Sequence, residues 1–397
     1  MRSLGLLVVL MLQTARLAGQ QPITRQQAVD AAISRGARTA VARADTLVGS
    51  AGLIAARQFE NPSLALTYSK STPKYHEILD LPLDITGSRS ARIASAQATR
   101  LASQYRFRFE RAAAALDADT TYTRSLAALG HLRLARRNAR DADSLRRMAI
   151  IRRDAGDASE LDVLLATVNA GQAANLAAVD SLTLVSTLFD LQAVMGFDTS
   201  IVVVIPTDSL TLPPTEDSTF TNTLPLPIAA AQQALTAAEL SVRAQRRSIF
   251  APLSVQAGIE HGDPSESGLL PTVGVSIPLP ILNRNRGAIA QAEAERARAR
   301  AELELARLET RTAIARAQRQ RTVALERIRR DQQLVESANR IVAMSLTAYR
   351  EGAQGLPAVL EAQRNARDIL SQYIDDVAEA WIASAVVRLY NLTAQSP

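Results

Sequence analysis

Residues 82–98 read PLDITGSRSARIASAQA, and residues 278–294 read PLPILNRNRGAIAQAEA. The two segments lie 196 positions apart, and the same offset relates Gly156 to Gly352. An offset that stays constant over about 80 residues indicates an internal duplication, because unrelated segments would not keep one register. The chain is therefore predicted to contain two copies of one structural plan.

Each copy is predicted to run as helix, strand, strand, very long helix, tight turn and returning helix. The first copy covers residues 20–196, with a hairpin at 63–84, a long helix at 88–153 and a returning helix at 159–195. The second copy covers residues 225–397, with a hairpin at 252–280, a long helix at 288–351 and a returning helix at 356–392. A shorter helix precedes each hairpin, at 24–58 and at 227–247. The linker 197–224 is predicted to form a belt around the helical body.

Residues 1–19 have the character of an export signal. Arg2 is followed by an apolar run from Leu4 to Leu12 and then by small and polar residues, which is the order of a signal peptide. The run is too short to cross a bilayer, which takes about 20 residues. We predict no transmembrane helix after it, so contact with a membrane would have to be made by strands.

The two predicted hairpins alternate between apolar and polar residues. In residues 63–70, for example, the apolar positions are Leu64, Leu66 and Tyr68. Such strands are typical of outer-membrane barrels, in which about 9–11 residues span the bilayer. Four strands cannot close a barrel, because the smallest has about eight, and the chain is therefore predicted to oligomerise. A soluble sandwich is the alternative, although it would need more strands to bury its faces.

Composition excludes several classes of function. With no cysteine and three histidines, the chain is predicted to hold no metal site and no cofactor. It has no HExxH, GxSxG or GxGxxG motif, so no catalytic centre is predicted and the protein is not expected to be an enzyme. The net charge of +6 comes from arginines interleaved with Asp and Glu. That pattern is typical of solvated helix faces and argues against a nucleic-acid partner.

The quoted segments and their surroundings resemble the TolC-type outer-membrane efflux proteins. The resemblance rests on NPSLALTYS from Asn61, GVSIPLPILNRNRGAIAQAEAE from Gly274, and the turns RRDAGDASELDVLLA from Arg152 and YREGAQGLPAVLEAQR from Tyr349. It covers essentially the whole chain after the signal. The second hairpin is most similar to the heavy-metal efflux branch of that family.

The resemblance implies an α+β membrane protein that assembles as a homotrimer. Its hairpins would form a twelve-stranded β-barrel in the outer membrane, continued by an α-helical periplasmic tunnel of antiparallel coiled-coil helices. Such a protein is a passive exit duct, with heavy-metal cations as a candidate cargo. Its implied partners are outer-membrane lipid, a periplasmic membrane-fusion adaptor and an inner-membrane efflux pump of the RND type. The alternative is a periplasmic coiled-coil scaffold without a barrel, which would have no use for the hairpins.

Both helix turns are candidate contact sites for the adaptor, because the resemblance makes them the periplasmic tips. The candidate residues are Gly156, Ser159, Leu161, Val163, Leu164, Gly352, Gly355, Leu356, Val359 and Leu360. The alternative is simple turn chemistry, in which glycine ends one helix, serine caps the next and the leucines are core. Turn chemistry explains the glycines, but not why both turns keep the same spacing from Gly to Val-Leu.

Asp162 and Glu361 occupy positions that, in similar proteins, carry acidic residues near the periplasmic mouth. In a trimer they would form a constriction of six carboxylates, which attracts cations and repels anions. The ring would be sparse, because the residue that matches Asp162 in the second copy is Ala358. A solvated carboxylate on a helix surface is the alternative.

Overall fold

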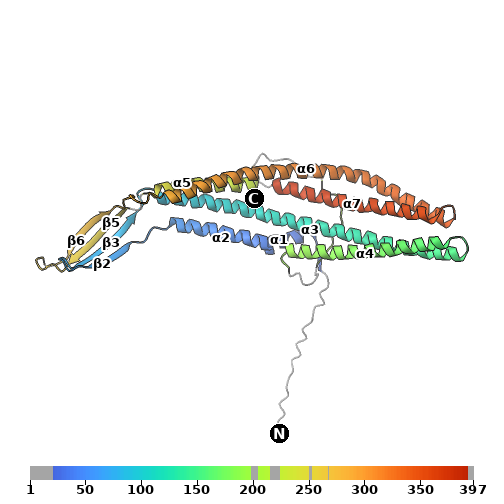
Figure 1. Cartoon of the computed structure of the whole chain (residues 1–397), viewed down its shortest axis with the longest axis horizontal. Coiled ribbons are helices and arrows are strands. Elements are labelled where there is room, and N and C mark those ends of the chain that lie inside the picture. The colour runs from blue at the N-terminus through green and yellow to red at the C-terminus, as the bar shows by residue number, and fades with distance from the viewer. Residues whose placement is uncertain (1–20, 198–203, 215–223, 250–252, 267, 392–397) are drawn as a thin grey trace, which may run out of the picture. The chain divides into compact units, whose positions relative to one another are not determined.

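The computed structural model describes residues 21–197, 204–214, 224–249, 253–266 and 268–391. The predicted signal peptide and part of the predicted linker lie outside the described residues. In chain order the elements are β1 (Gln21–Ile23), α1 (Arg25–Arg35), α2 (Ala37–Arg57), β2 (Ser63–Tyr68), β3 (Tyr75–Leu83), α3 (Ser88–Asp154), α4 (Glu160–Val194), β4 (Val204–Pro206), α5 (Leu226–Arg247), β5 (Leu253–His261), β6 (Leu270–Ser276), α6 (Arg286–Arg350) and α7 (Leu356–Asn391) (Figure 1).

The chain divides into two compact units, each built from three separate stretches of sequence. Of the described residues, the turn unit contains 21–32, 117–197, 204–212 and 324–381. The sheet unit contains, of the described residues, 33–116, 213–214, 224–249, 253–266, 268–323 and 382–391. The turn unit holds the connections from α3 to α4 and from α6 to α7, and the sheet unit holds β2, β3, β5 and β6. Each unit therefore combines segments from both predicted copies.

Two helices are unusually long, α3 with 67 residues and α6 with 65. Their length is favoured by long stretches without helix-breaking residues. In α6, for example, Gly287 is the one glycine and there is no proline. The helix expected at 24–58 is wrong as a single element, because it is divided into α1 and α2. The break falls at Gly36, whose ψ of 134° is an extended conformation that cannot continue a helix.

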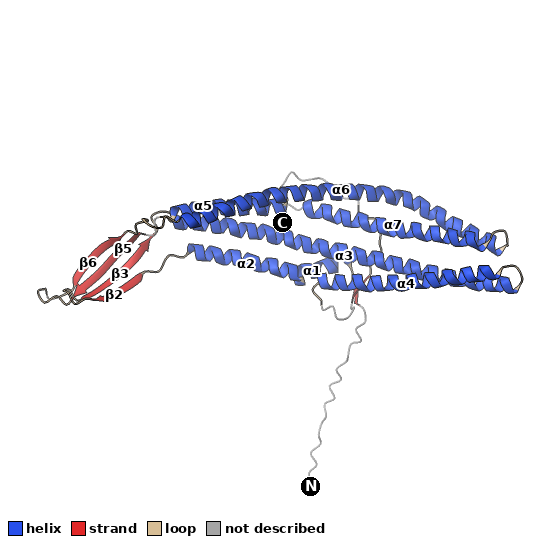
Figure 2. Cartoon of the chain, in the orientation of Figure 1, coloured by secondary structure: helices blue, strands red, loops and turns tan. Residues whose placement is uncertain are grey.

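The sheet unit contains an antiparallel sheet of four strands in the order β2-β3-β5-β6, drawn as strands in Figure 2. The central pair, β3 and β5, joins the hairpin of the first copy to the hairpin of the second. In the register, Leu79 lies between Leu64 of β2 and Ala257 of β5. Val273 of β6 lies opposite Ala257, so alternate residues of all four strands share a face.

One face of this sheet is predominantly apolar and the other predominantly polar, as the alternation in the sequence predicts. The apolar sheet face consists of Leu64, Leu66, Tyr68, Tyr75, Glu77, Leu79, Leu81, Leu83, Leu253, Val255, Ala257, Ile259, His261, Pro271, Val273 and Val275. The polar sheet face includes Ser63, Thr67, His76, Asp80, Ser254, Gln256, Glu260, Thr272, Gly274 and Ser276. Side chains of the apolar sheet face are left uncovered, with Leu66 71% and Val273 80% exposed.

Part of the linker is fastened to the turn unit. β4 pairs in parallel with β1, and the Tyr122 hydroxyl donates a hydrogen bond of 2.9 Å to the Ile23 carbonyl. The same hydroxyl lies 2.9 Å from Asp208, and burial raises the pKa of Tyr122 to about 12. Trp381 Nε1 donates to the Thr211 carbonyl, so two residues that follow β4, Asp208 and Thr211, contact the helices.

By length and composition alone, α4 is apolar enough to cross a membrane. The sequence pattern, in contrast, predicts no helix of this kind after the signal peptide. Most of its apolar stretch is not buried within the chain, and the exposed residues follow a helical period that is described below. An uncovered apolar stripe on a helix is equally the mark of a surface that packs against another protein.

Candidate functional site at the helix turns

The first helix turn is closed by two hydrogen bonds around Gly156. The amide of Asp157 donates to the Arg152 carbonyl at 2.8 Å, and the amide of Gly156 donates to the Arg153 carbonyl at 2.9 Å. This Schellman pattern needs a left-handed residue, and Gly156 supplies it with a φ of +85°. Turn chemistry therefore accounts for this glycine.

The second helix turn repeats the same pattern. The amide of Ala353 donates to the Ala348 carbonyl at 2.8 Å, and the amide of Gly352 donates to the Tyr349 carbonyl at 3.2 Å. Gly352 has a φ of +76°, whereas Gly355 does not have a positive φ. The matching glycines of the two copies thus have the same conformational role.

Ser159 and Asp162 form a capping box at the start of α4. The Ser159 hydroxyl accepts a hydrogen bond of 3.2 Å from the Asp162 amide, and the Asp162 carboxylate accepts one of 3.2 Å from the Ser159 amide. Each bond satisfies a backbone group that the helix start leaves without a partner. The predicted capping role of Ser159 is confirmed, and Asp162 has a structural role in addition to its charge.

Some of the candidate contact residues lie in the core of the turn unit. Val163 is buried, and Leu356 and Val359 are 0% exposed. They share a cluster with Leu145, Ala149, Ala166 and Tyr349, against which Leu360 also packs. Because the cluster contains residues of α3, α4, α6 and α7, it holds the two turns together. For these three residues, the core interpretation is the one that the structure supports.

Leu161 and Leu164, in contrast, are 63% and 56% exposed. They belong to an α4 stripe of exposed apolar residues that the helical period places on one face. The α4 stripe consists of Leu161, Leu164, Val168, Val179 and Leu182. Among the candidate residues, these two leucines are therefore the ones available to a partner.

Arg152 joins the two turns, and the sequence alone gave no sign of it. Its guanidinium donates to the Tyr349 carbonyl at the end of α6 and, at 3.3 Å, to the Asp157 carbonyl of its own turn. It also lies 4.6 Å from the centre of the Tyr349 ring. A cation at a helix C-terminus is favoured by the helix dipole as well as by the hydrogen bond.

The two candidate constriction residues have different surroundings. Asp162 is half-buried in its capping box, whereas the Glu361 side chain is 60% exposed and lies 3.7 Å from Arg364. The arginine, one helical turn away, partly offsets the charge of Glu361. Within the described part of the chain, no group of three or more His, Asp or Glu residues is arranged to hold a metal ion.

His131 brings together a hydroxyl, an imidazole and a carboxylate. Its Nε2 lies 2.8 Å from Asp375, and its Nδ1 lies 3.4 Å from the Ser371 hydroxyl. The hydrogen bond to Asp375 raises the pKa of His131. A nucleophile and its base need a contact of about 2.6–3.2 Å, and the serine contact is longer. The contacts of His131 with Asp375 and Ser371 therefore connect α3 to α7.

Comparison with known families confirms the resemblance seen in the sequence. The family model described as outer membrane efflux protein matches residues 28–196 and 226–395. No curated protein sequence matches the chain.

Several solved structures share the fold. A membrane protein from Pseudomonas aeruginosa is 19% identical with a TM-score of 0.78, and 93% of each chain is covered. The CmeC outer membrane channel of Campylobacter jejuni is 16% identical with a TM-score of 0.80, covering 94% of this chain and 87% of CmeC. The outer membrane protein VceC of Vibrio cholerae is 15% identical with a TM-score of 0.80, covering 93% of this chain and 96% of VceC.

Proposed function

Because the chain belongs to the outer membrane efflux protein family, we propose that it is the outer-membrane exit duct of a tripartite efflux system. In this role it has no catalytic activity and passively conducts substrates. An inner-membrane pump of the RND type exports them through a periplasmic membrane-fusion adaptor. The observation that carries the proposal is the four-stranded sheet, whose apolar face is uncovered in the single chain.

A homotrimer would complete this sheet. β2 and β6 are its edge strands, and long exposed edges favour pairing with another chain. A closed barrel needs about eight strands or more, whereas one chain supplies four. Three chains would supply twelve, with β6 of one protomer beside β2 of the next. The apolar sheet face would then contact lipid and the polar sheet face would line the lumen.

Two neighbouring residues of β6 test this assignment. Val273 lies on the apolar sheet face and Thr272 on the polar sheet face. A cation on the lipid side of a barrel costs about 2–4 kcal/mol at the bilayer midplane and much less in the lumen. Val273→Arg should therefore sharply reduce the amount of protein in the outer membrane, whereas Thr272→Arg should leave it near the wild-type amount. Equal effects of the two substitutions would contradict the proposal.

Adaptor docking is assigned to the exposed leucines of the first turn. Leu161 and Leu164 would contact the adaptor, while Val163, Leu356 and Val359 keep the turns in shape. In cells that lack the native copy, Leu161→Ala with Leu164→Ala should restore less resistance to efflux substrates at an unchanged level in the outer membrane. The matched control is Val179→Ala with Leu182→Ala, on the same stripe but away from the turn. If both pairs lower resistance equally, docking is not specific to the turn.

Asp162 and Glu361 would bias conductance toward cations. Asp162→Asn can retain the capping bond through its side-chain oxygen, so the double variant Asp162→Asn with Glu361→Gln removes charge with little change of shape. Channels of this variant in planar bilayers should lose cation selectivity. Unchanged selectivity would overturn the constriction assignment.

Heavy-metal cations are the cargo favoured by the likeness of the second hairpin to the heavy-metal efflux branch. Deletion of the gene should then increase sensitivity to transition-metal salts more than sensitivity to organic toxicants. The periplasmic scaffold remains the competing function, and the two differ in the sheet. A scaffold would tolerate arginine at position 273 as readily as at position 272.

A further inference from the structure

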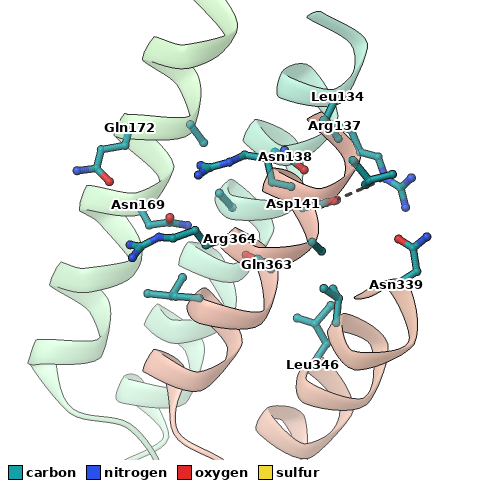
Figure 3. Close-up of a pocket in the computed structure, with 17 residues that line it drawn as sticks. Leu134, Arg137, Asn138, Asp141, Asn169, Gln172, Asn339, Leu346, Gln363 and Arg364 are labelled. Carbon is teal, nitrogen blue, oxygen red and sulfur yellow. Dashed lines mark ion pairs between the residues drawn. The ribbon is translucent and has the colours of Figure 1, made fainter. Parts of the chain in front are cut away.

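We propose that the turn unit contains a binding pocket for a small organic anion, a carboxylate with a single ring or a short apolar body. The pocket has a volume of about 140 Å³ and is formed by α3, α4, α6 and α7 (Figure 3). That volume resembles cavities of about 150 Å³ that hold one benzene ring. Because the pocket is partly open to solvent, this volume matches the bulk of such a molecule without enclosing it completely.

Positive charge predominates in the lining. Arg137, Arg364 and Arg367 line the pocket together with a single carboxylate, Asp141. Arg367 is paired at 2.9 Å with Asp368, which is outside the lining. Arg137 lies 3.9 Å from Asp141, and Arg364 lies 3.7 Å from Glu361, which is also outside the lining. Charge-assisted bonds are normally about 2.7–2.9 Å long, so both guanidinium groups keep donors free for another oxygen. In Figure 3 the Arg364 side chain extends from α7 toward α4, beside Asn169.

Side-chain amides complete the polar part of the lining. They are Asn138, Asn169, Gln172, Asn339 and Gln363. Among the described residues, the Asn138 Nδ2 is buried and has no hydrogen-bond acceptor. A buried donor without a partner costs about 1–3 kcal/mol, and such groups in native proteins normally have one. The pocket thus offers one buried donor that lacks an acceptor, on Asn138, beside four amides that are half-buried or exposed.

Apolar side chains form the rest of the pocket. Leu134, Val342, Leu346, Leu360 and Leu370 line it alongside the guanidinium and amide groups. A bare sulfate or phosphate would use the donors but leave these side chains in contact with water. An organic carboxylate would satisfy both, and carboxylate oxygens match the paired donors of a guanidinium. Because its lining comes from both copies, an occupant would also tie α3 and α4 to α6 and α7.

Calorimetric titration of the detergent-extracted full-length protein with benzoate tests the proposal. Benzoate should bind and raise the melting temperature, whereas benzamide, its uncharged analogue of nearly equal shape, should bind at least tenfold more weakly. Sulfate at matched ionic strength should not reproduce the effect. Equal binding of benzoate and benzamide would overturn the proposal. The absence of benzoate binding would also overturn it, and water alone would then occupy the pocket.

Three variants locate the binding. Arg364→Gln with Arg367→Gln should abolish benzoate binding, and Gln363→Glu, which adds a negative charge without a change of size, should weaken it at least tenfold. Arg340→Gln is the control, because Arg340 is an exposed arginine of α6 outside the pocket. Binding that survives in both pocket variants, or that falls equally in Arg340→Gln, would place the anion elsewhere. These results do not depend on the proposed duct, since they require neither a barrel nor an adaptor.

Discussion

Removal of the Arg152 side chain should loosen the connection between the two helix turns. The guanidinium makes a charged hydrogen bond to the Tyr349 carbonyl, a longer one of 3.3 Å to Asp157, and a contact with the Tyr349 ring 4.6 Å away. A hydrogen bond from a charged group contributes about 1.5–3 kcal/mol, and a partly exposed cation–π contact about 0.5–1 kcal/mol. Since the parts are not additive, Arg152→Ala should cost about 2–3 kcal/mol locally.

Hydrogen exchange of the full-length protein measures this cost directly. About 2–3 kcal/mol corresponds to opening that is roughly 30- to 150-fold more frequent. Peptides that cover residues 346–360 should exchange faster in Arg152→Ala by that factor, while peptides from the sheet should be unchanged. Arg152→Lys should give an intermediate result, because lysine keeps the charge but not the fork of donors.

Arg153→Ala is the matched control. Arg153 pairs with Asp154 and Glu160 near its own turn, and these surface pairs do not reach the end of α6. Its removal should leave exchange over residues 346–360 close to wild type. If Arg152→Ala and Arg153→Ala give the same exchange over residues 346–360, Arg152 does not join the two turns.

Three further substitutions test the packing of the turn unit. Leu356→Ala should lower stability by about 2–5 kcal/mol, measured by denaturant unfolding, because Leu356 is 0% exposed and a cavity would remain. Tyr349→Phe should leave the melting temperature unchanged or raise it, since the Tyr349 hydroxyl is buried without a hydrogen-bond partner. Burial, together with the neighbouring Asp376, raises the pKa of Asp331, so the folded state loses stability as pH rises through that pKa. Asp331→Asn should therefore raise the melting temperature at neutral pH and flatten its decline as pH rises above the ordinary pKa of an aspartate, and a wild-type pH profile in this variant would contradict the assignment.

Much of the architecture follows from patterns that are local in the sequence. The long helices follow from stretches without Gly or Pro, and the faces of the sheet follow from alternation such as that of Leu64, Leu66 and Tyr68. The break at Gly36 is not predictable from the sequence, because one glycine in an otherwise helical pattern does not itself end a helix. There the backbone takes an extended conformation.

The candidate site was only partly predictable, because burial depends on which helices lie across from one another. The spacing of the turns does not distinguish Leu161, which is exposed, from Leu356, which is core. Arg152 was indistinguishable in the sequence from other arginines on helix surfaces. The pocket could not be anticipated either, since its amides come from four helices, two from each copy.

The location and mass of the full-length protein decide whether it forms a trimeric barrel in the outer membrane. Membranes from expressing cells are separated on a sucrose gradient, and the extracted protein is run on gels with and without heating. We expect an outer-membrane fraction and an unheated species with three times the mass of one chain, which collapses to a single chain on heating. A periplasmic protein that migrates as a monomer or dimer would contradict this expectation, because the apolar sheet face would then have no membrane to contact.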